Sequence, residues 1–381
     1  MNLSQKLTIE LISCELFGGN ISAGTALIDE NVLSEVYSYA VEQDVTYIVA
    51  SALSKLGLLS GESKAIFFNE QLGSVFRNEQ FLHDMEFITS VLENNQIAYI
   101  PLKGAIIKQY YPRPEMRTSC DIDVLIHEAD LQNALEKLYA AGCVYVSECS
   151  HDVMLSTPAG TYLELHFTLN EYEFSADEIL KNAWDYASVT CDCRYDFSAE
   201  FFIFYHIAHI ARHVYTGGCG IRPFVDLKII LDNFEFDNSK LTDLLEKAGL
   251  TTFYDTAKRL AKMWFEGYES TELALTLENY ILQSGIYGNV ENKIAVINEK
   301  NGNKAKYIMS IIFPSLKSLK KKYTILNKAP FLLPFVHVYR WFASFFKGSY
   351  KGILRIFKTS GNLSDAKQNE IGNLLKSLDL K

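Results

Sequence analysis

The sequence predicts an α+β protein, in which a small mixed β-sheet over residues 96–170 is flanked by helical regions. Before residue 95, and again from about Ala176 to Ser284, apolar residues recur at three- and four-residue spacing, the period of an amphipathic helix. Between these regions lie short β-prone runs bounded by Gly and Pro. We expect four parts: an N-terminal helical region over 1–95, the sheet core over 96–170, a helical domain over 171–299 and a basic helical region over 300–381.

The elements of the core are expected in a definite order. A short strand ending at Pro101 leads into a helix over Ala105–Tyr110, and a proline-broken loop follows. The next strand lies in RTSCDIDVLI, residues 117–126. An amphipathic helix then starts at Leu131, with Gly142 at its C-terminal cap. Three more strands are expected over 143–148, 153–157 and 161–168, and a Pro-Ala-Gly turn joins the last two.

The composition is that of an ordinary globular protein. Of the 381 residues, 48% are hydrophobic and 22% charged, which suits two or three domains. The N-terminus has no basic start followed by an apolar run, so we expect no secretory signal. Seven scattered cysteines favour a reducing compartment, and the single C-x-C at Cys191 and Cys193 is a poor zinc motif. Together these features predict a cytoplasmic protein.

The strand in RTSCDIDVLI carries two aspartates on one face. Asp121 and Asp123 are two residues apart, so their side chains point the same way while Ile122 and Val124 point the other way. Two neighbouring carboxylates raise each other's energy unless a positive group compensates. A divalent metal ion is the obvious candidate for that group.

A later predicted strand, YLELHF, supplies a third carboxylate. Glu164 and His166 share one face of this strand. Asp121, Asp123 and Glu164 would together offer the oxygen ligands that Mg²⁺ prefers, alongside a bound phosphate. One or two such ions would suit an in-line displacement at phosphorus. His166 would then lie near the triphosphate or the acceptor, and a buried, hydrogen-bonded histidine is the alternative.

The LKG motif lies at the junction between the first strand and the helix after it. Gly104 would let a phosphate approach the backbone closely, and the following helix would offer N–H groups to it. Lys103 would neutralise phosphate charge, and Arg117, close before the aspartates, has a similar predicted role. Each motif is common by itself, and the prediction depends on their combination.

In this order the motifs resemble a known family. LKG, then R-x-x-C-D-I-D-V-L-I, then L-E-L-H-F is similar to the uncharacterised bacterial nucleotidyltransferases of the polymerase-β-like superfamily. The likeness continues through HIARH, Gly217-Gly218 and the IRPFVD run at 221–226, and through residues 313–340. It spans about Asp44 to Arg340. The resemblance implies a mixed-sheet nucleotidyltransferase core with helical additions.

The resemblance also implies an activity. The enzyme would use Mg²⁺ to move a nucleoside monophosphate from an NTP to an acceptor hydroxyl, with release of pyrophosphate. The acceptor stays open: a small molecule, a protein or RNA. The implied roles are metal binding by Asp121 and Asp123, metal binding or proton uptake by Glu164, phosphate binding by Gly104, and an acceptor side formed by His213, Arg222 and Asp226.

Two alternatives to this activity remain. The superfamily usually has Ser or Gly after the phosphate-binding glycine, whereas this chain has Ala105, which favours a catalytically weakened nucleotide-binding or regulatory module. A toxin-like tRNA-modifying transferase is the second alternative. His206, His209 and His213 share one helix face, but no carboxylate or thiolate at a matching spacing supports a metal site, so we favour a structural role.

The C-terminal region has an unusual charge balance. The chain carries a net charge of −10, yet residues 300–363 contain thirteen Lys or Arg and no Asp or Glu. We favour packing of this segment against the acidic body, with an anionic partner (RNA, a nucleotide-bearing polymer or lipid) at 300–358 as the alternative. Its apolar run FLLPFVHVYRWFASFF is too short and polar to be transmembrane. We expect a core-facing helix there rather than one lying in a membrane interface.

Overall fold

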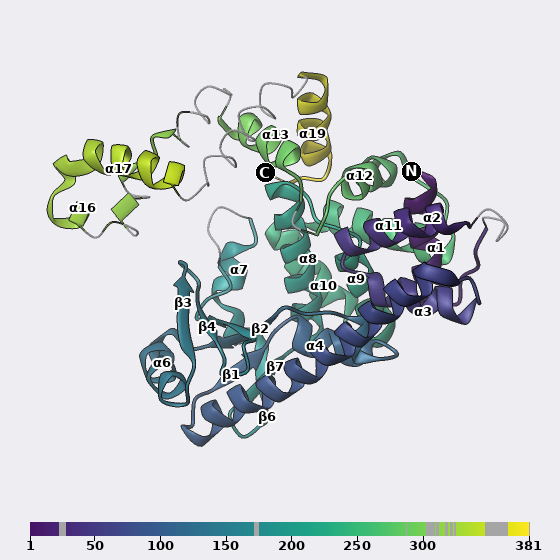
Figure 1. Ribbon diagram of the computed structural model, residues 1–381. Coiled ribbons are helices and arrows are strands. Elements are labelled where there is room, and N and C mark those ends of the chain that lie inside the picture. Colours follow the sequence, from purple (N-terminus) through teal and green to yellow (C-terminus); the bar gives the residue numbers. More distant parts are fainter. Residues whose placement is uncertain are drawn as a thin grey trace.

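The computed structural model describes the chain except residues 23–27, 171–174, 287, 302–308, 310–311, 317–318, 321–322, 324, 347–364 and 381 (Figure 1). The N-terminal region is helical, as predicted, and ends with a helix of 34 residues that runs along the sheet. Its helices are α1 (Leu3–Phe17), α2 (Glu30–Glu42), α3 (Thr46–Lys55) and α4 (Gly61–Asn94).

One mixed sheet of seven strands forms the centre of the fold, which confirms the predicted α+β class. Its strand order is β3-β4-β5-β2-β1-β7-β6. The central strands are β1 and β2, which run antiparallel, and β5, which pairs with β2 in parallel. The strands are β1 (Tyr99–Pro101), β2 (Asp121–Ile126), β3 (Val144–Glu148), β4 (Asp152–Ser156), β5 (Tyr162–His166), β6 (Ala187–Cys191) and β7 (Arg194–Phe197).

Strands β6 and β7 correct the expectation that the chain is helical from 176 to 284. They form an antiparallel hairpin, and β7 adds to β1 in parallel through the Tyr99–Arg194 register pair. The turn between them holds Asp192 at a φ of 44°. These strands are five and four residues long and have no buried residues. Polar and apolar residues do alternate in both strands, but over only five and four positions, so the strand signal is short and was missed.

Two hydrophobic cores cover the two faces of the sheet. Ile122 and Val124 of β2 pack with apolar residues of α4 and of α6 (Leu131–Ala140). The opposite face, which includes Leu125, joins the larger core formed with the N-terminal and middle helices. The two predicted faces of β2 are therefore confirmed. Both aspartates lie on the face that the helical region covers.

The middle region continues as a helical layer over the site face. After the short α7 (Asp177–Lys181) and the β6–β7 hairpin, α8 begins with a side-chain cap from Ser198 to the Phe201 N–H. The helices of this layer are α8 (Ala199–Thr216), α9 (Arg222–Asn233), α10 (Asn238–Ala248), α11 (Thr251–Glu266), α12 (Glu272–Leu282) and α13 (Val290–Asn301). The four domain boundaries given by the sequence stay predictions.

The C-terminal region is also helical where it is described. It comprises α16 (Ile325–Lys328), α17 (Leu333–Phe346) and α19 (Asp365–Ser377). Among the described residues, no helix is long and apolar enough to cross a membrane. All seven cysteines are free thiols. We expected the basic segment to pack against the acidic body. Most of the Lys and Arg residues of that segment lie outside the described residues.

Candidate active site

Three side chains from two adjacent strands converge at the centre of the sheet. Asp123 of β2 and Glu164 of β5 are register partners in the parallel pair, so they point to the same face. The Nε2 atom of His166 lies 3.1 Å from Asp123 Oδ1 and 3.5 Å from Glu164 Oε2. Ligand atoms of all three residues lie within 4.8 Å of one another. The arrangement brings together three of the predicted site residues.

Asp121 lies beside this group on the same face, but it is not one of the three. Its register partner on β5 is Tyr162. Burial, followed by the charges of Asp123 and Glu164, raises the pKa of Asp121 to about 6. Asp121 is thus the carboxylate of this face whose charge the protein compensates least.

Asp123 is held ionised by two cationic partners. Lys103 Nζ lies 3.2 Å from Asp123 Oδ1, the same oxygen that His166 contacts. Burial alone would raise the pKa of Asp123, but the charges of Lys103 and His166 outweigh burial and lower it. Burial would lower the pKa of His166, and its contacts with Asp123 and Glu164 raise it instead. Asp123 and each of its cationic partners therefore stabilise each other's charged forms.

The LKG motif occupies the predicted junction between β1 and a helix. The backbone hydrogen bond from Leu102 N to Asp123 O (3.0 Å) fastens this junction to β2. Lys103 follows with a φ of 34°, a left-handed conformation that is rare for a residue with a side chain. The expected helix over Ala105–Tyr110 is a four-residue α5 (Gly104–Ile107) followed by a 3₁₀ turn, η2 (Lys108–Tyr110).

Gly104 is required by the space around it. A Cβ atom at this position would lie 2.8 Å from both Arg117 Nη1 and Ser119 Oγ. The N–H groups of Ala105 and Ile106 already donate to the Leu102 and Lys103 carbonyls. The predicted row of unpaired N–H groups at the helix start is therefore much reduced, and the glycine mainly makes room for the Arg117 guanidinium.

Arg117 forms a buried pair with a residue of the helical layer. Its Nε and Nη2 atoms donate to the two carboxylate oxygens of Asp226 on α9, at 2.9 and 3.0 Å. The Tyr111 hydroxyl donates to the same carboxylate at 2.8 Å. Asp226 is only 2% exposed. The predicted phosphate role of Arg117 and acceptor role of Asp226 stay predictions. The geometry shows a link between the loop before β2 and α9.

The remaining acceptor-side candidates lie on α8 and α9. His213 Nε2 is 3.0 Å from His209 Nε2, so one imidazole donates to the other. Burial, then the charge of Arg212, lowers the pKa of His213 to about 3, and burial also lowers the pKa of His209. Arg222 forms an ion pair with Asp44 and donates to the Thr118 carbonyl at 3.2 Å. His213 and Arg222 therefore do not join the Asp123 group.

Comparison with known proteins identifies the family. The sequence family described as uncharacterised nucleotidyltransferase matches residues 29–266. The chain belongs to this family. The match includes the LKG motif, both aspartates, Glu164 and the helical layer through α11. It confirms the resemblance drawn from the motifs.

Other comparisons add little to this assignment. One solved structure with a match is the antibiotic-resistance factor ANT(2'')-Ia, whose title describes substrate-regulated conformation dynamics. It is 12% identical to this nucleotidyltransferase, with a TM-score of 0.36, and the match covers 48% of this chain and 97% of that one. No curated protein matches the chain.

The side chains at the site of this nucleotidyltransferase are chemically suited to bind a divalent metal ion. Carboxylate oxygens from Asp123 and Glu164 face each other, with Asp121 two residues away on the same face. Hard cations such as Mg²⁺ favour such oxygens, while the His166 nitrogen is less usual for Mg²⁺. The raised pKa of Asp121 means that this face can accept further positive charge.

Sequence reasoning did not single out Tyr205 and Arg212 of α8. Tyr205 of α8 is buried next to Lys103, and burial, only partly offset by the Lys103 charge, raises the pKa of its hydroxyl. Tyr205, His209 and Arg212 also line a small cleft below α7. They were missed because the periodicity of α8 does not tell which of its turns faces the sheet.

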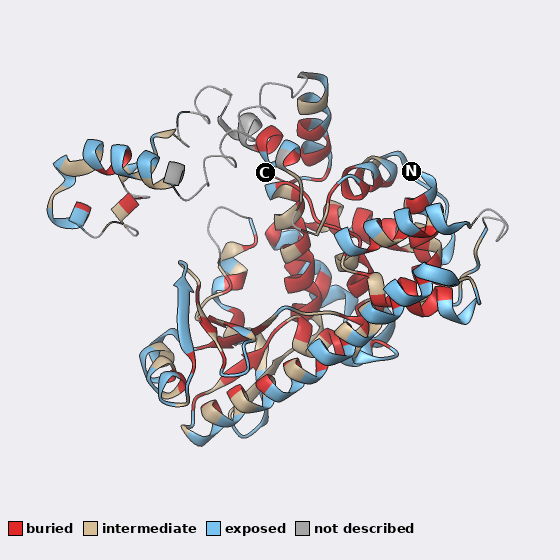
Figure 2. Cartoon of the chain, in the orientation of Figure 1, coloured by how far each residue is buried: buried red, intermediate tan, exposed pale blue. Residues whose placement is uncertain are grey.

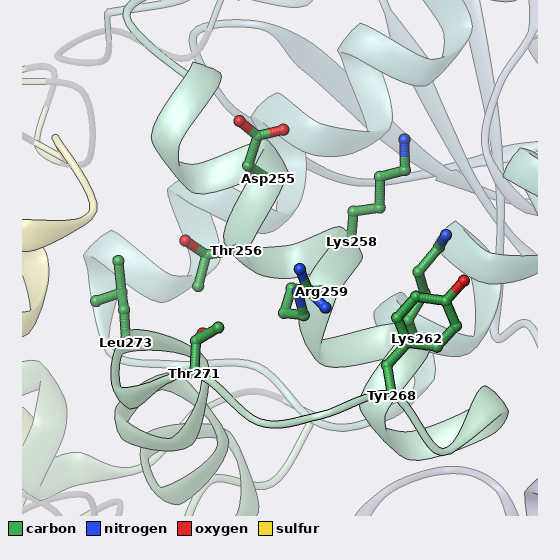
Figure 3. A pocket seen from close by; sticks show the side chains of 8 residues that line it. All are labelled: Asp255, Thr256, Lys258, Arg259, Lys262, Tyr268, Thr271 and Leu273. Atoms are coloured by element: carbon green, nitrogen blue, oxygen red, sulfur yellow. The ribbon is translucent and has the colours of Figure 1, made fainter.

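A separate cavity of about 420 Å³ lies between α11 and α12 (Figure 3). Its charged lining is mainly cationic, with Asp255 as the one acidic residue among the lining side chains. The Tyr268 ring lies 4.7 Å from Lys262 Nζ and 5.8 Å from the Arg259 guanidinium carbon. The cavity shares no residue with the candidate active site, and one carboxylate does not make a metal site.

Proposed function

We propose that this protein is a Mg²⁺-dependent nucleotidyltransferase that moves a nucleoside monophosphate from an NTP to an acceptor hydroxyl. The observation that carries the proposal is the pairing of Asp123 with Glu164 on adjacent parallel strands, with His166 in contact with both. In this proposal Asp121, Asp123 and Glu164 hold one or two Mg²⁺ ions. The family assignment supports nucleotidyl transfer in general terms.

The phosphate side of the site would be formed by residues near the LKG junction. Lys103, whose side chain is about one-fifth exposed, is close enough to the carboxylates to meet a triphosphate bound against them. His166 keeps Asp123 ionised by holding a positive charge beside it. Gly104 leaves room for Arg117, whose contact with Asp226 fixes the guanidinium in one place. Arg117 thereby adds positive potential near the phosphates without changing position.

The chemical step is an in-line displacement at the α-phosphorus. The acceptor oxygen forms a bond to this atom, the bond from it to the bridging oxygen breaks, and pyrophosphate leaves with the electron pair. Glu164 is the more exposed of the two carboxylates in the converging group, and we assign it the proton of the acceptor hydroxyl. When bound, Mg²⁺ would neutralise charge on the transferring and leaving phosphates. The protein's own contribution is positioning and fixed charge.

The acceptor would approach from the helical layer. We place it along α8 and α9, where His213, Arg222 and Asp226 lie, with Asp226 acting through its contact with Arg117. The acceptor is a small molecule, a protein or RNA. The seven free thiols suit a reducing compartment, and we infer a cytoplasmic location from them.

One experiment tests both the activity and its alternatives. The full chain is incubated with each α-³²P-labelled NTP, Mg²⁺ and a cell lysate, and pyrophosphate release and label transfer are measured. Label transfer with pyrophosphate release, absent in Asp123→Ala, is the expected result. Metal-dependent NTP binding without pyrophosphate would instead support the regulatory module that Ala105 suggests. Label confined to RNA would support the tRNA-modifying alternative. Equal transfer by wild type and Asp123→Ala would contradict the proposal.

A further inference from the structure

Helix α17 of the C-terminal region, with the turn before it, carries large apolar side chains that stay exposed in the described part of the chain. Phe331, Phe335 and Phe342 are 77%, 71% and 63% exposed, and Val338 is exposed between them. Phe335, Val338 and Phe342 follow a spacing of three and four residues, which places them on one side of α17, and Phe331 lies in the 3₁₀ turn η6 (Pro330–Leu332) directly before it. We call Phe331, Phe335, Val338 and Phe342 the aromatic face. The core-facing helix expected from the sequence is therefore wrong for these residues (Figure 2).

The opposite side of the same helix already has its packing partners. Leu332, Leu333 and Val336 pack with Leu319 and Leu326 in a small separate core. The Trp341 indole N–H donates to the Ile312 carbonyl at 3.2 Å. The aromatic face is thus not needed to hold α17 in its own substructure, and its exposure needs another explanation.

The positive charge of the C-terminal region indicates what kind of surface would bind the aromatic face. Residues 300–363 contain thirteen Lys or Arg and no Asp or Glu. Lys328, which is exposed, lies close before the face in the sequence, and Lys320 is half-buried. A second copy of this chain would bring the same positive charge to the contact, which opposes pairing through this region. A negatively charged surface with an apolar layer beneath it would match both the positive charge of this region and its exposed apolar side chains.

The length of α17 indicates how this helix would bind such a surface. α17 has 14 residues, which at 1.5 Å per residue gives about 21 Å, less than the ~30 Å hydrocarbon core of a bilayer. Helices with one apolar face and flanking Lys or Arg lie in the plane of the headgroups and bind more strongly to anionic lipid. We propose that the aromatic face docks α17 flat on an anionic lipid bilayer. The face lies outside residues 29–266, so the proposal is independent of the proposed activity.

Vesicle binding tests this proposal on the full chain. Sucrose-loaded vesicles of phosphatidylcholine, with or without phosphatidylglycerol, are sedimented with wild type, with a Phe331→Ser/Phe335→Ser/Phe342→Ser variant, and with Phe68→Ser/Phe76→Ser. Phe68 and Phe76 are exposed phenylalanines of α4, so the last variant is a matched control. We expect wild type and the control to bind anionic vesicles, and the triple variant to bind at least ten-fold more weakly.

A local signal shows whether α17 itself makes the contact. Of the three tryptophans, Trp341 is 41% exposed, Trp264 is buried and Trp184 is half-buried. We expect a blue shift of tryptophan emission on adding anionic vesicles, and its loss in Trp341→Phe shows that it comes from Trp341. Equal sedimentation of wild type and the triple variant would overturn the proposal. So would a dimer by light scattering that the triple variant dissociates, in the absence of vesicle binding. RNA binding that depends on the aromatic face, again without vesicle binding, would also overturn it.

Discussion

Asp123 on β2 and Glu164 on β5 face each other across a parallel strand pair, 41 positions apart in sequence. His166 contacts both, and Lys103 contacts Asp123. The site is therefore built on the two central strands of the sheet, with its loop residues attached to them. Rigid strands can hold such groups in place more exactly than loops can. Several consequences for stability and activity can be measured.

The buried Arg117–Asp226 pair should be essential for stability. We expect Asp226→Ala to lower the free energy of unfolding by about 3–5 kcal/mol, because it leaves the Arg117 charge buried without its carboxylate. Urea denaturation measures this. Asp232→Ala on the same helix is the control, since Asp232 is an exposed partner of Lys228 and should cost at most about 1 kcal/mol. Similar losses in the free energy of unfolding for the two variants would show that the buried pair stabilises the fold no more than the exposed one.

Gly104→Ala should damage the phosphate side through crowding. The added methyl group would meet Arg117 Nη1 and Ser119 Oγ at 2.8 Å, and Arg117 cannot simply turn away because Asp226 holds it. We expect a loss of about 1–3 kcal/mol in stability and a clear fall in nucleotide affinity. Calorimetric NTP titration and urea denaturation measure the two effects. Ala105→Ser, which adds an atom one residue later, should stay within about 1 kcal/mol of wild type. Unchanged NTP affinity in Gly104→Ala would contradict this account of the glycine.

Asp121 should make the metal-free protein less stable at high pH. Burial, then the charges of Asp123 and Glu164, raises its pKa to about 6 in the folded state, from 3.8 in the unfolded state. Its stabilising contribution is therefore fully present below pH 3.8 and is lost as pH rises through about 6. In EDTA, Asp121→Asn should be more stable than wild type by roughly 1–3 kcal/mol at pH 8, with little difference near pH 4. Thermal denaturation at the two pH values checks this. A stability difference between Asp121→Asn and wild type that is the same at both pH values would refute it.

The buried Lys108 should produce the opposite dependence on pH. Its ammonium is 2% exposed, lies 3.6 Å from the Phe81 ring centre and donates to Asn78. Burial, then the charge of Arg117, lowers its pKa to about 7. Stability from Lys108 is present above its unfolded pKa of about 10.4 and is lost as pH falls through 7. Relative to wild type, Lys108→Met should gain stability at pH 6 and lose that advantage by pH 10. Urea denaturation measures the stability difference between Lys108→Met and wild type. A difference that does not change with pH would disprove the lowered pKa of Lys108.

The sequence revealed the faces of the site but not its register. The period of a strand places Asp121 with Asp123, and Glu164 with His166, without any structure. Which aspartate stands opposite Glu164 depends on how β2 and β5 pair, and this non-local choice leaves no local signal. The Arg117–Asp226 contact joins residues 109 positions apart, so it was equally hidden.

The missed elements have physical reasons of their own. Strands β6 and β7 have no fully buried residue and alternate polar and apolar residues over only five and four positions, a signal short enough to be missed. The aromatic face of α17 has the same helical spacing that a core helix has. Periodicity shows that a helix has an apolar side, but it cannot tell whether protein or another surface covers that side.

Binding of Mn²⁺ tests the central claim most directly, because Mn²⁺ accepts the same carboxylate ligands as Mg²⁺ and is visible by electron paramagnetic resonance. The full chain is titrated with Mn²⁺ in the presence of a non-hydrolysable NTP analogue, alongside Asp123→Asn, Glu164→Gln and the control Asp232→Asn. We predict that wild type and the control bind Mn²⁺ alike, and that each site variant, still folded by circular dichroism, binds it at least about ten-fold more weakly. Wild-type affinity in both site variants would contradict the account.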